Sequence, residues 1–488
     1  MEYSVNDNDS HLRARPMPLG LYNASLFSLT PRLVLQKYLS ELSRLSRLAL
    51  PLVFTQLAQM SMSVADTMMA GRVSSVELAG VALGTVVYWP IMLLVSGTMM
   101  SITPSVAQLN GAGRGSEAGE VVRQAFWIAL VGGVCLIFAY RNLTPLYEFV
   151  GVDAAAIPVT TAYLYAMSFG VVPVLCYFCM RYLCEGMGWT IPALAITISA
   201  LLLKIPLNYW FIYGGWGVPA MGGEGCGWAS VVVFCYQAAA IAMVVRFSRI
   251  RHCGLFSRFS WPEFVAIRRL VALGAPIGLS TFAEYSVFST LTLLIGRLGV
   301  DKVAAHQIAS NIGGLTFMIP LALGMAASIR VGFNVGASDF EAARRSGAVA
   351  LGTSFAFALM AALVLVLGND FIAGLYTTEA GVMTLAAELL ILVAIYQPFD
   401  DVQGTAIGAL RGFKDTRTPF FVAVCAYWFV GFPLSWALGF GYFERFDYGV
   451  YGYWVGLILG LVVASVVLVG RFAWLSRRTD RIRQLALR

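Results

Sequence analysis

The chain has 488 residues, of which 59% are apolar and only 12% charged, and its formal net charge is +7. Soluble domains carry about twice that fraction of charged residues, so the composition excludes an ordinary soluble protein. Apolar runs of membrane-spanning length recur along the chain. They have the length of helices rather than of barrel strands, which predicts an all-α polytopic membrane protein.

Residues 1–44 are polar, basic and proline-containing, and they predict a flexible cytoplasmic tail without a signal peptide. About twelve transmembrane helices follow, at 45–70, 78–101, 121–141, 160–184, 190–213, 227–247, 268–296, 303–328, 346–368, 384–410, 418–440 and 451–474. The first six predict an N-lobe (45–247) and the last six a C-lobe (268–475), joined by a basic cytoplasmic linker (248–267). Residues 476–488 predict a second cytoplasmic tail.

Lysine and arginine are distributed very unevenly between the two sides. With the N-terminus inside, 27 basic residues fall on the cytoplasmic side and five outside, the five being Arg72, Arg141, Arg297, Lys302 and Arg445. This split follows the positive-inside rule and predicts that both termini are cytoplasmic. The positive charge therefore reflects topology, and no nucleic-acid partner is expected.

The two halves of the chain repeat each other at an offset of about 225 residues. Pro51 and Gly71-Arg72 match Pro276 and Gly296-Arg297, Gly111-Ala112 matches Gly336-Ala337, and Pro173 matches Pro398. An even number of helices per copy gives both copies the same orientation. The repeat therefore predicts two pseudo-symmetric six-helix lobes around an axis along the membrane normal, an architecture typical of transporters.

Four acidic residues lie well inside predicted spans, away from the span ends, namely Asp66, Glu284, Asp400 and Asp401. Each costs about 2.5–3.5 kcal/mol to insert at the centre of a span, so each needs a reason. The repeat mate of Asp66 is a leucine and that of Glu284 is a glutamine, which indicates different chemistry in the two lobes. Two further charges near cytoplasmic ends, Glu185 and Arg411, are expected to reach the interface and to be structural.

The stretch AIYQPFDDVQG, residues 394–404, carries the densest polar set. Tyr396, Asp400 and Gln403 share one helix face, whereas Asp401 lies about 100° away and is expected to pair with Gln397. Pro398 leaves a backbone carbonyl without a donor. These oxygen donors suit Na⁺ or a proton rather than zinc or copper. The alternative interpretation is that the acids simply face a water-filled cavity.

Lys204 is the only lysine or arginine near the middle of a predicted span, and it needs a carboxylate partner. We expect that partner to be Asp66, with Asn208 joining the network one helical turn further on. No P-loop or catalytic motif occurs, so no cofactor is expected and an ion gradient must supply the energy. Packing roles are expected for His306 and for the Cys176–Cys179 pair.

Several stretches resemble the multidrug and toxic compound extrusion (MATE) family, in its bacterial NorM-like branch. They are VADTMMAG, VAQLNGAGR, the GCG of GGEGCGW, FAEYSVF, AAHQ, LALGMAASIRVG and ALRGFKDTRTP. The resemblance covers about residues 45–475. It implies a monomeric bacterial inner-membrane antiporter that expels organic cations and amphipathic drugs in exchange for Na⁺ or H⁺.

The resemblance also implies roles for individual residues. Glu284, Asp400 and Tyr396 match a cation-coupling site of the C-lobe, for which the resemblance implies Na⁺ as the metal ion. Asp66 matches an acid linked to proton and drug binding in the N-lobe, where Asn208 and Lys204 would join it. Gln307 matches a glutamine at the drug-binding cleft.

Two residues depart from the family pattern. Asp401 is an extra acid, interpreted as a drug-facing or proton-accepting carboxylate. Lys204 stands where relatives usually have asparagine, which disfavours a sodium site beside Asp66. Three alternative functions would need other features. A flippase for lipid-linked precursors would need a cationic cavity, an intramembrane enzyme would need a nucleophile–base or metal set, and a passive channel would not support uphill efflux.

Overall fold

The structure is a computed structural model that describes residues 23–150, 154–215, 217–440 and 448–486. In this part of the chain, eleven helices are long and apolar enough to span a membrane. Two shorter helices, bent by 49° at Gly170, would together form a twelfth span. The predicted all-α fold with about twelve transmembrane helices is therefore confirmed.

The first half of the chain is a series of antiparallel helices. They are α1 (Asn23–Gly71), α2 (Ser75–Met99), α3 (Ile102–Gly111), α4 (Ala118–Arg141), α5 (Thr144–Val150), α6 (Ile157–Phe169), α7 (Val171–Gly186), α8 (Ile191–Tyr213) and α9 (Gly223–Phe247), with a 3-10 turn, η1, at Gly115–Glu117. The bent pair α6 and α7 takes the place of the predicted fourth span.

The second half begins with a 3-10 turn, η2 (Arg249–Cys253). Its helices are α10 (Phe264–Ile295), α11 (Val300–Gly336), α12 (Phe340–Tyr376), α13 (Ala380–Gly412), α14 (Arg417–Ala423), α15 (Phe432–Gly439), α16 (Gly449–Leu475) and α17 (Thr479–Ala486), with the 3-10 turn η3 at Gly296–Leu298 and the π-helix η4 at Val424–Gly431. α13 runs as one helix through Pro398.

Both predicted tails contain helix. Residues 23–44 belong to α1, whereas residues 1–22 of the predicted flexible tail lie outside the described residues. The buried carboxylate of Glu41 fixes the last part of this segment to the C-lobe. It accepts two hydrogen bonds from Arg330, each 2.8 Å long, and a third from Ser346. The C-terminal tail holds α17, and the boundaries of the two lobes stay predictions.

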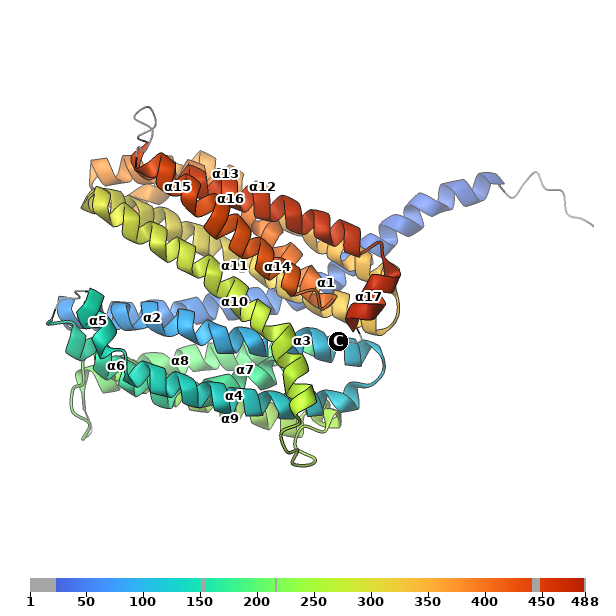
Figure 1. Cartoon of the computed structure of the whole chain (residues 1–488), viewed down its shortest axis with the longest axis horizontal. Helices are drawn as coiled ribbons and strands as arrows, with labels where there is room; N and C mark the ends of the chain where they lie inside the picture. The colour runs from blue at the N-terminus through green and yellow to red at the C-terminus, as the bar shows by residue number, and fades with distance from the viewer. Residues whose placement is uncertain (1–22, 151–153, 216, 441–447, 487–488) are drawn as a thin grey trace, which may run out of the picture.

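The helices form two layers, with α2–α9 in one and α11–α16 in the other (Figure 1). The first helix of each half contacts both layers. The cytoplasmic part of α1 packs Leu45, Ala49 and Leu52 into a core with residues of α11, while Met62 further along packs against Ala200 and Val233 of the N-lobe. α10 likewise runs from the α2–α4 layer to the α11–α16 layer (Figure 1).

The two lobes meet in a reciprocal contact between α3 and α11. A Cβ added to Gly111 would collide with the carbonyl oxygen of Phe333, and one added to Gly336 would collide with the carbonyl oxygen of Gln108. These pairs are repeat mates at an offset of 225, and the same contact made twice in exchanged roles is what a two-fold axis requires. The two pseudo-symmetric lobes are therefore confirmed.

Close contacts between the lobes lie at the helix ends that are predicted to be cytoplasmic. Gly278 of α10 lies against Gly97 of α2, and Gln108 donates a 3.0 Å hydrogen bond to the carbonyl of Gly412. At the opposite end, marked by α5 and α15, the two layers of helices diverge (Figure 1).

Candidate functional site

A buried ion pair occupies the N-lobe between α1 and α8. The Nζ atom of Lys204 lies 2.8 Å from Oδ2 of Asp66, and Asn208 donates a 2.8 Å hydrogen bond to Oδ1. Asp66, Lys204 and Asn208 are all less than 9% exposed. The partners predicted from sequence are therefore in contact. Lys204 and Asn208 share a face of α8 because they are four residues apart.

The sequence did not reveal one member of this cluster. Ser230 of α9 accepts a 2.8 Å hydrogen bond from Lys204 and donates its own proton to the carbonyl of Cys226. Its hydroxyl inside an apolar span was the only available signal. With Ser230 and Asp66 both in contact with Lys204, the charges of this cluster compensate each other.

The C-lobe brings its acids together from different helices. Tyr427 of η4 donates a 3.3 Å hydrogen bond to Glu284 of α10 and accepts a 2.5 Å hydrogen bond from Gln403 of α13. Asp400 is 6% exposed and lies within electrostatic reach of the Glu284 carboxylate. Within the described chain, Asp400 has no ion pair or hydrogen bond from a side chain. The negative charge of this cluster is therefore not compensated as it is around Asp66.

Tyr396 lies on the same buried face of α13 but does not bond Asp400. Its ring stacks on Trp454 of α16 with a centroid separation of 5.9 Å. Its hydroxyl lies over Gly313 of α11, where any Cβ would collide with it. The structure thus places Tyr396 beside the acidic cluster and fixes its ring through two neighbouring helices.

Tyr427 was missed because its position depends on a local irregularity. Pro433 has no N–H, so the carbonyl of Phe429 lacks its usual donor four residues later. The backbone N–H of Phe432 instead bonds the carbonyl of Tyr427, five residues earlier, as in a π-helix. Such wide turns are frequent at functional sites, and the proline was the available signal.

Asp401 follows Asp400 on α13, about 100° further around the helix axis, and lies inside the C-lobe. It accepts a 2.6 Å hydrogen bond from Gln397, as predicted, and Gln397 in turn accepts one of 3.0 Å from Thr316 of α11. Its side chain is fully buried, which argues against direct contact with a drug. The proton-accepting interpretation stays a prediction.

Gln307 and His306 are neighbours on α11 but differ in environment. Gln307 is exposed and makes no side-chain hydrogen bond with the described residues, so it is free to meet a ligand. His306 is buried, accepts or donates a 3.0 Å hydrogen bond with Thr292, and packs edge-on against Trp454 at 5.5 Å. The packing role expected for His306 agrees with this geometry.

The expectation that Glu185 reaches the interface is wrong. Glu185 is completely buried and accepts a 2.6 Å hydrogen bond from Arg181, which also donates to Gln56 of α1. The i,i+4 pairing lets both charges stay inside the lobe. Arg411 is half-buried and lies within electrostatic reach of Glu284, so it forms the cationic border of the acidic cluster.

The donor chemistry of the C-lobe cluster fits a small hard cation. Two carboxylates, a phenol and an amide supply oxygen atoms, which alkali ions and protons prefer. Among the described residues, no group of three or more histidine, cysteine, aspartate or glutamate side chains is arranged for a metal. A site for zinc or copper is therefore not indicated in that part of the chain.

Comparison with known proteins identifies the family. The MatE family model matches residues 51–210 and 276–437, one segment in each half. The chain is 38% identical over 446 residues to "Multidrug resistance protein MdtK" of Yersinia pseudotuberculosis serotype O:1b, covering 91% of this chain and 98% of that protein. The chain belongs to the MatE family. The protein of the same name from Proteus mirabilis is 38% identical over 455 residues, with 92% and 98% covered.

Solved MATE structures share this fold. The eukaryotic MATE transporter AtDTX14 superposes with a TM-score of 0.83 at 20% identity, covering 92% of this chain and 99% of that one. The Vibrio cholerae MATE transporter VcmN, in its bent form, gives a TM-score of 0.80 at 18% identity, with 93% and 99% covered. The family match and the MdtK relatives together make the chain a multi-pass membrane transporter.

Proposed function

We propose that this MatE protein exports cationic and amphipathic organic compounds across the bacterial inner membrane in exchange for Na⁺ or H⁺. Two observations support the proposal. Relatives that align over nearly their whole length are named multidrug resistance proteins. The chain also buries Asp400 without a cationic partner in the described residues, and such a charge is costly unless it has a functional role.

The proposal that transport is coupled to a cation depends on one observation, which is the difference in charge compensation between the two acidic clusters. Asp66 is neutralised by Lys204 at 2.8 Å, whereas Asp400 has no cationic partner in the described chain and lies near a second carboxylate. Like charges in a low-dielectric site favour uptake of a cation or a proton. We therefore assign the coupling cation to Glu284, Asp400 and Tyr396, with Tyr427 and Gln403 as supporting donors.

In the same scheme, the N-lobe cluster responds to protons. Protonation of Asp66 would weaken its ion pair with Lys204 and leave Asn208 and Ser230 to repartner, which changes the surface that α1 and α8 present. Drug cations would be attracted by carboxylates and by aromatic faces, and the exposed Gln307 would contribute an amide. Asp401 enters this scheme only as a possible proton acceptor.

Alternating access would come from movement of the lobes about their α3–α11 contact. With the lobes in contact at the predicted cytoplasmic end and diverging at the other, the structure corresponds to an outward-facing state under the positive-inside topology. Cation and drug would then compete for acids or favour different states, so that loading one releases the other. A monomer has both sites and would suffice.

The test is ethidium efflux from proteoliposomes under separately imposed Na⁺ and pH gradients. Asp400→Asn removes the uncompensated charge, and we expect gradient-driven efflux to fall at least about tenfold, the effect of losing roughly 1.4 kcal/mol of cation binding. Asp370→Asn is the matched control, because Asp370 is an exposed aspartate of α12 that lies outside both acidic clusters. It should retain most of the efflux.

Two results would oppose the proposal. Normal uphill efflux by Asp400→Asn would show that this acid does not couple transport. Efflux by the unaltered protein that is indifferent to both gradients would point instead to a passive channel. A response to only one gradient would identify the coupling ion.

A further inference from the structure

A second polar site lies outside both acidic clusters, at the predicted cytoplasmic end of the C-lobe. A half-open cavity of about 510 Å³ is bordered by the start of α10, the turn between α13 and α14, and the end of α17. Its lining includes four basic side chains, which are Arg268, Arg269, Lys414 and Arg417. The transport scheme gives these residues no role.

The basic residues of this cavity lack compensating acids. Within the described chain, Arg268, Arg269 and Arg417 make no ion pair. The one carboxylate in the lining, Asp415, is bound to Arg471 at 2.8 Å and accepts hydrogen bonds from Thr418. The cavity therefore has a strong positive potential that an anion would neutralise.

Lys414 occupies its position at a conformational cost. Its φ is +60°, in the left-handed region that favours glycine at the end of a helix. The equivalent turn of the N-lobe reads EGMGWTIP, where the turn of the C-lobe reads RGFKDTRT. Gly188 takes the place of Lys414 with a φ of +76°, and Ile191 takes the place of Arg417. The fold of this turn therefore does not require charged residues at the positions of Lys414 and Arg417. These two cations occur only in the C-lobe turn.

The environment of Lys414 is consistent with a missing anion. Two effects lower the pKa of Lys414 to about 8. The larger effect is burial, and the smaller is the positive charge of Arg269. Its ammonium donates a 3.1 Å hydrogen bond to the carbonyl of Ala486 in α17, a neutral partner. A bound anion would offset both the burial and the repulsion.

Apolar residues border the same cavity. Phe264 is 77% exposed and Val265 53% exposed, and Leu273 and Leu485 also line the cavity. At the predicted cytoplasmic end of the spans, such side chains would lie near the headgroup–acyl boundary, where basic pockets between helices recognise phosphate headgroups. A free phosphate ion would contact the cations but would make no favourable contact with the apolar residues at the border of the cavity.

We infer that this cavity binds the phosphate headgroup of an anionic phospholipid from the cytoplasmic leaflet, with its acyl chains along the exposed face of α10. The cations contact the phosphate, and Phe264 and Val265 contact the start of the chains. The inference does not depend on the coupling ion or on the drugs transported.

The experiment is native mass spectrometry of the full chain titrated with phosphatidylglycerol, with phosphatidylcholine of the same acyl chains as the reference lipid. The test variant is R268Q/R269Q/R417Q. The matched control is R47Q/R246Q/R344Q, which removes three exposed arginines outside the cavity and without ion pairs in the described chain. Each cation near a membrane surface contributes about fivefold, so the test variant should lose on the order of 100-fold in phosphatidylglycerol affinity.

A second variant tests whether lipid binding can be lost without destabilising the fold. Lys414→Gly introduces the residue found in the N-lobe turn and relieves the left-handed backbone. It should keep the thermal unfolding midpoint or raise it while reducing phosphatidylglycerol affinity by about fivefold. Loss of lipid binding together with retained stability would separate the site from the fold.

Three results would overturn the inference. An equal loss in the matched control would show diffuse attraction to a basic surface. Displacement of the lipid by an equal concentration of inorganic phosphate or glycerol 3-phosphate would show a site for free phosphate. Equal affinity for phosphatidylcholine and phosphatidylglycerol in the unaltered protein would show that the cavity does not select an anionic phospholipid.

Discussion

Asp66 and Asp400 are both carboxylates buried within transmembrane helices, but their neighbours differ in charge. Asp66 lies 2.8 Å from Lys204 and accepts a further hydrogen bond from Asn208. Asp400 has carboxylates near it instead. A buried pair is strongly destabilised when only one partner is removed, because the other charge is then left without compensation. This asymmetry gives a prediction for the N-lobe that does not involve transport.

We predict that Lys204→Met destabilises the protein more than the double change Lys204→Met with Asp66→Asn. The single variant leaves Asp66 charged and unpaired, at a cost of about 3–5 kcal/mol, whereas the double variant removes both charges. Thermal unfolding in the same detergent measures the difference. Equal unfolding midpoints for the two variants would show that the ion pair is not what holds α1 against α8.

For individual residues, the sequence predicted contacts between side chains on the same helix and contacts between opposite charges. The contact between Asp401 and Gln397 was predictable from their i,i+4 spacing. The contact between Asp66 and Lys204 was predictable because each buried charge needed a partner of opposite sign. Tyr427 could not be placed, since its contacts join three elements and depend on a wide helical turn. Glu185 was misplaced because its internal partner, Arg181, was counted among the cytoplasmic residues.

Among the elements, the π-helix η4 has the most direct effect on the candidate site. Its wide turn is followed by Pro433 and carries Tyr427, whose hydroxyl links Gln403 of α13 to Glu284 of α10. An ordinary α-helix through the same residues would rotate the side chains that precede the proline. The local backbone therefore determines which group contacts the acid.

We predict that Tyr427→Phe and Pro433→Ala weaken cation-coupled efflux by similar amounts. Loss of the hydroxyl leaves Gln403 and Glu284 without a shared partner, which costs about 1–3 kcal/mol, or roughly tenfold in cation affinity. Alanine at 433 restores the missing N–H and favours closure of the wide turn. The concentration of cation that gives half-maximal ethidium efflux is the measurement.

The double variant distinguishes a shared cause from two separate ones. If Pro433→Ala acts by moving Tyr427, then combining it with Tyr427→Phe should add little to either single effect. Fully additive losses would indicate that the proline affects transport by another route, and would remove η4 from the explanation of the site.

The predicted elements were accurate in number and less accurate in shape. Apolar length alone identifies a span, which is why about twelve were found. It does not reveal that α6 and α7 are bent at Gly170 while their counterpart α13 is continuous, although both halves carry the matched proline. The repeat predicts a common scaffold, and the surrounding packing determines each bend.

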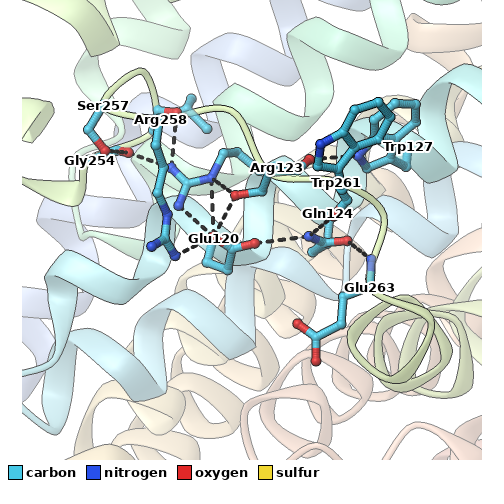
Figure 2. A network of polar contacts seen from close by, with 11 residues as sticks. Glu120, Arg123, Gln124, Trp127, Gly254, Ser257, Arg258, Trp261 and Glu263 are labelled. Atoms are coloured by element: carbon cyan, nitrogen blue, oxygen red, sulfur yellow. Dashed lines mark hydrogen bonds and ion pairs between the residues drawn. The ribbon is translucent and has the colours of Figure 1, made fainter.

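The first helix of each half, α1 and α10, contacts both lobes and links them. α1 is anchored at Glu41 to Arg330 of the C-lobe, and the segment leading into α10 is anchored to α4 of the N-lobe. Figure 2 shows this second anchor, in which Glu120 accepts hydrogen bonds from Arg123, Gln124 and Arg258, among others. The basic linker therefore does more than connect the lobes.

We predict that Glu120→Gln releases the linker from α4. The neutral side chain cannot compensate Arg123, whose side chain is only 10% exposed, and losing a charged hydrogen-bond partner costs about 1.5–3 kcal/mol. Trypsin cleavage after Arg258 should then accelerate roughly tenfold, because proteolysis follows the population of the opened segment. Glu117→Gln is the matched control, since Glu117 is an exposed acid three residues earlier whose partner is Arg114. Equal cleavage rates in the two variants would mean that the contacts of Glu120 do not hold the linker, and that the lobes are joined on this side by the helix α10 alone.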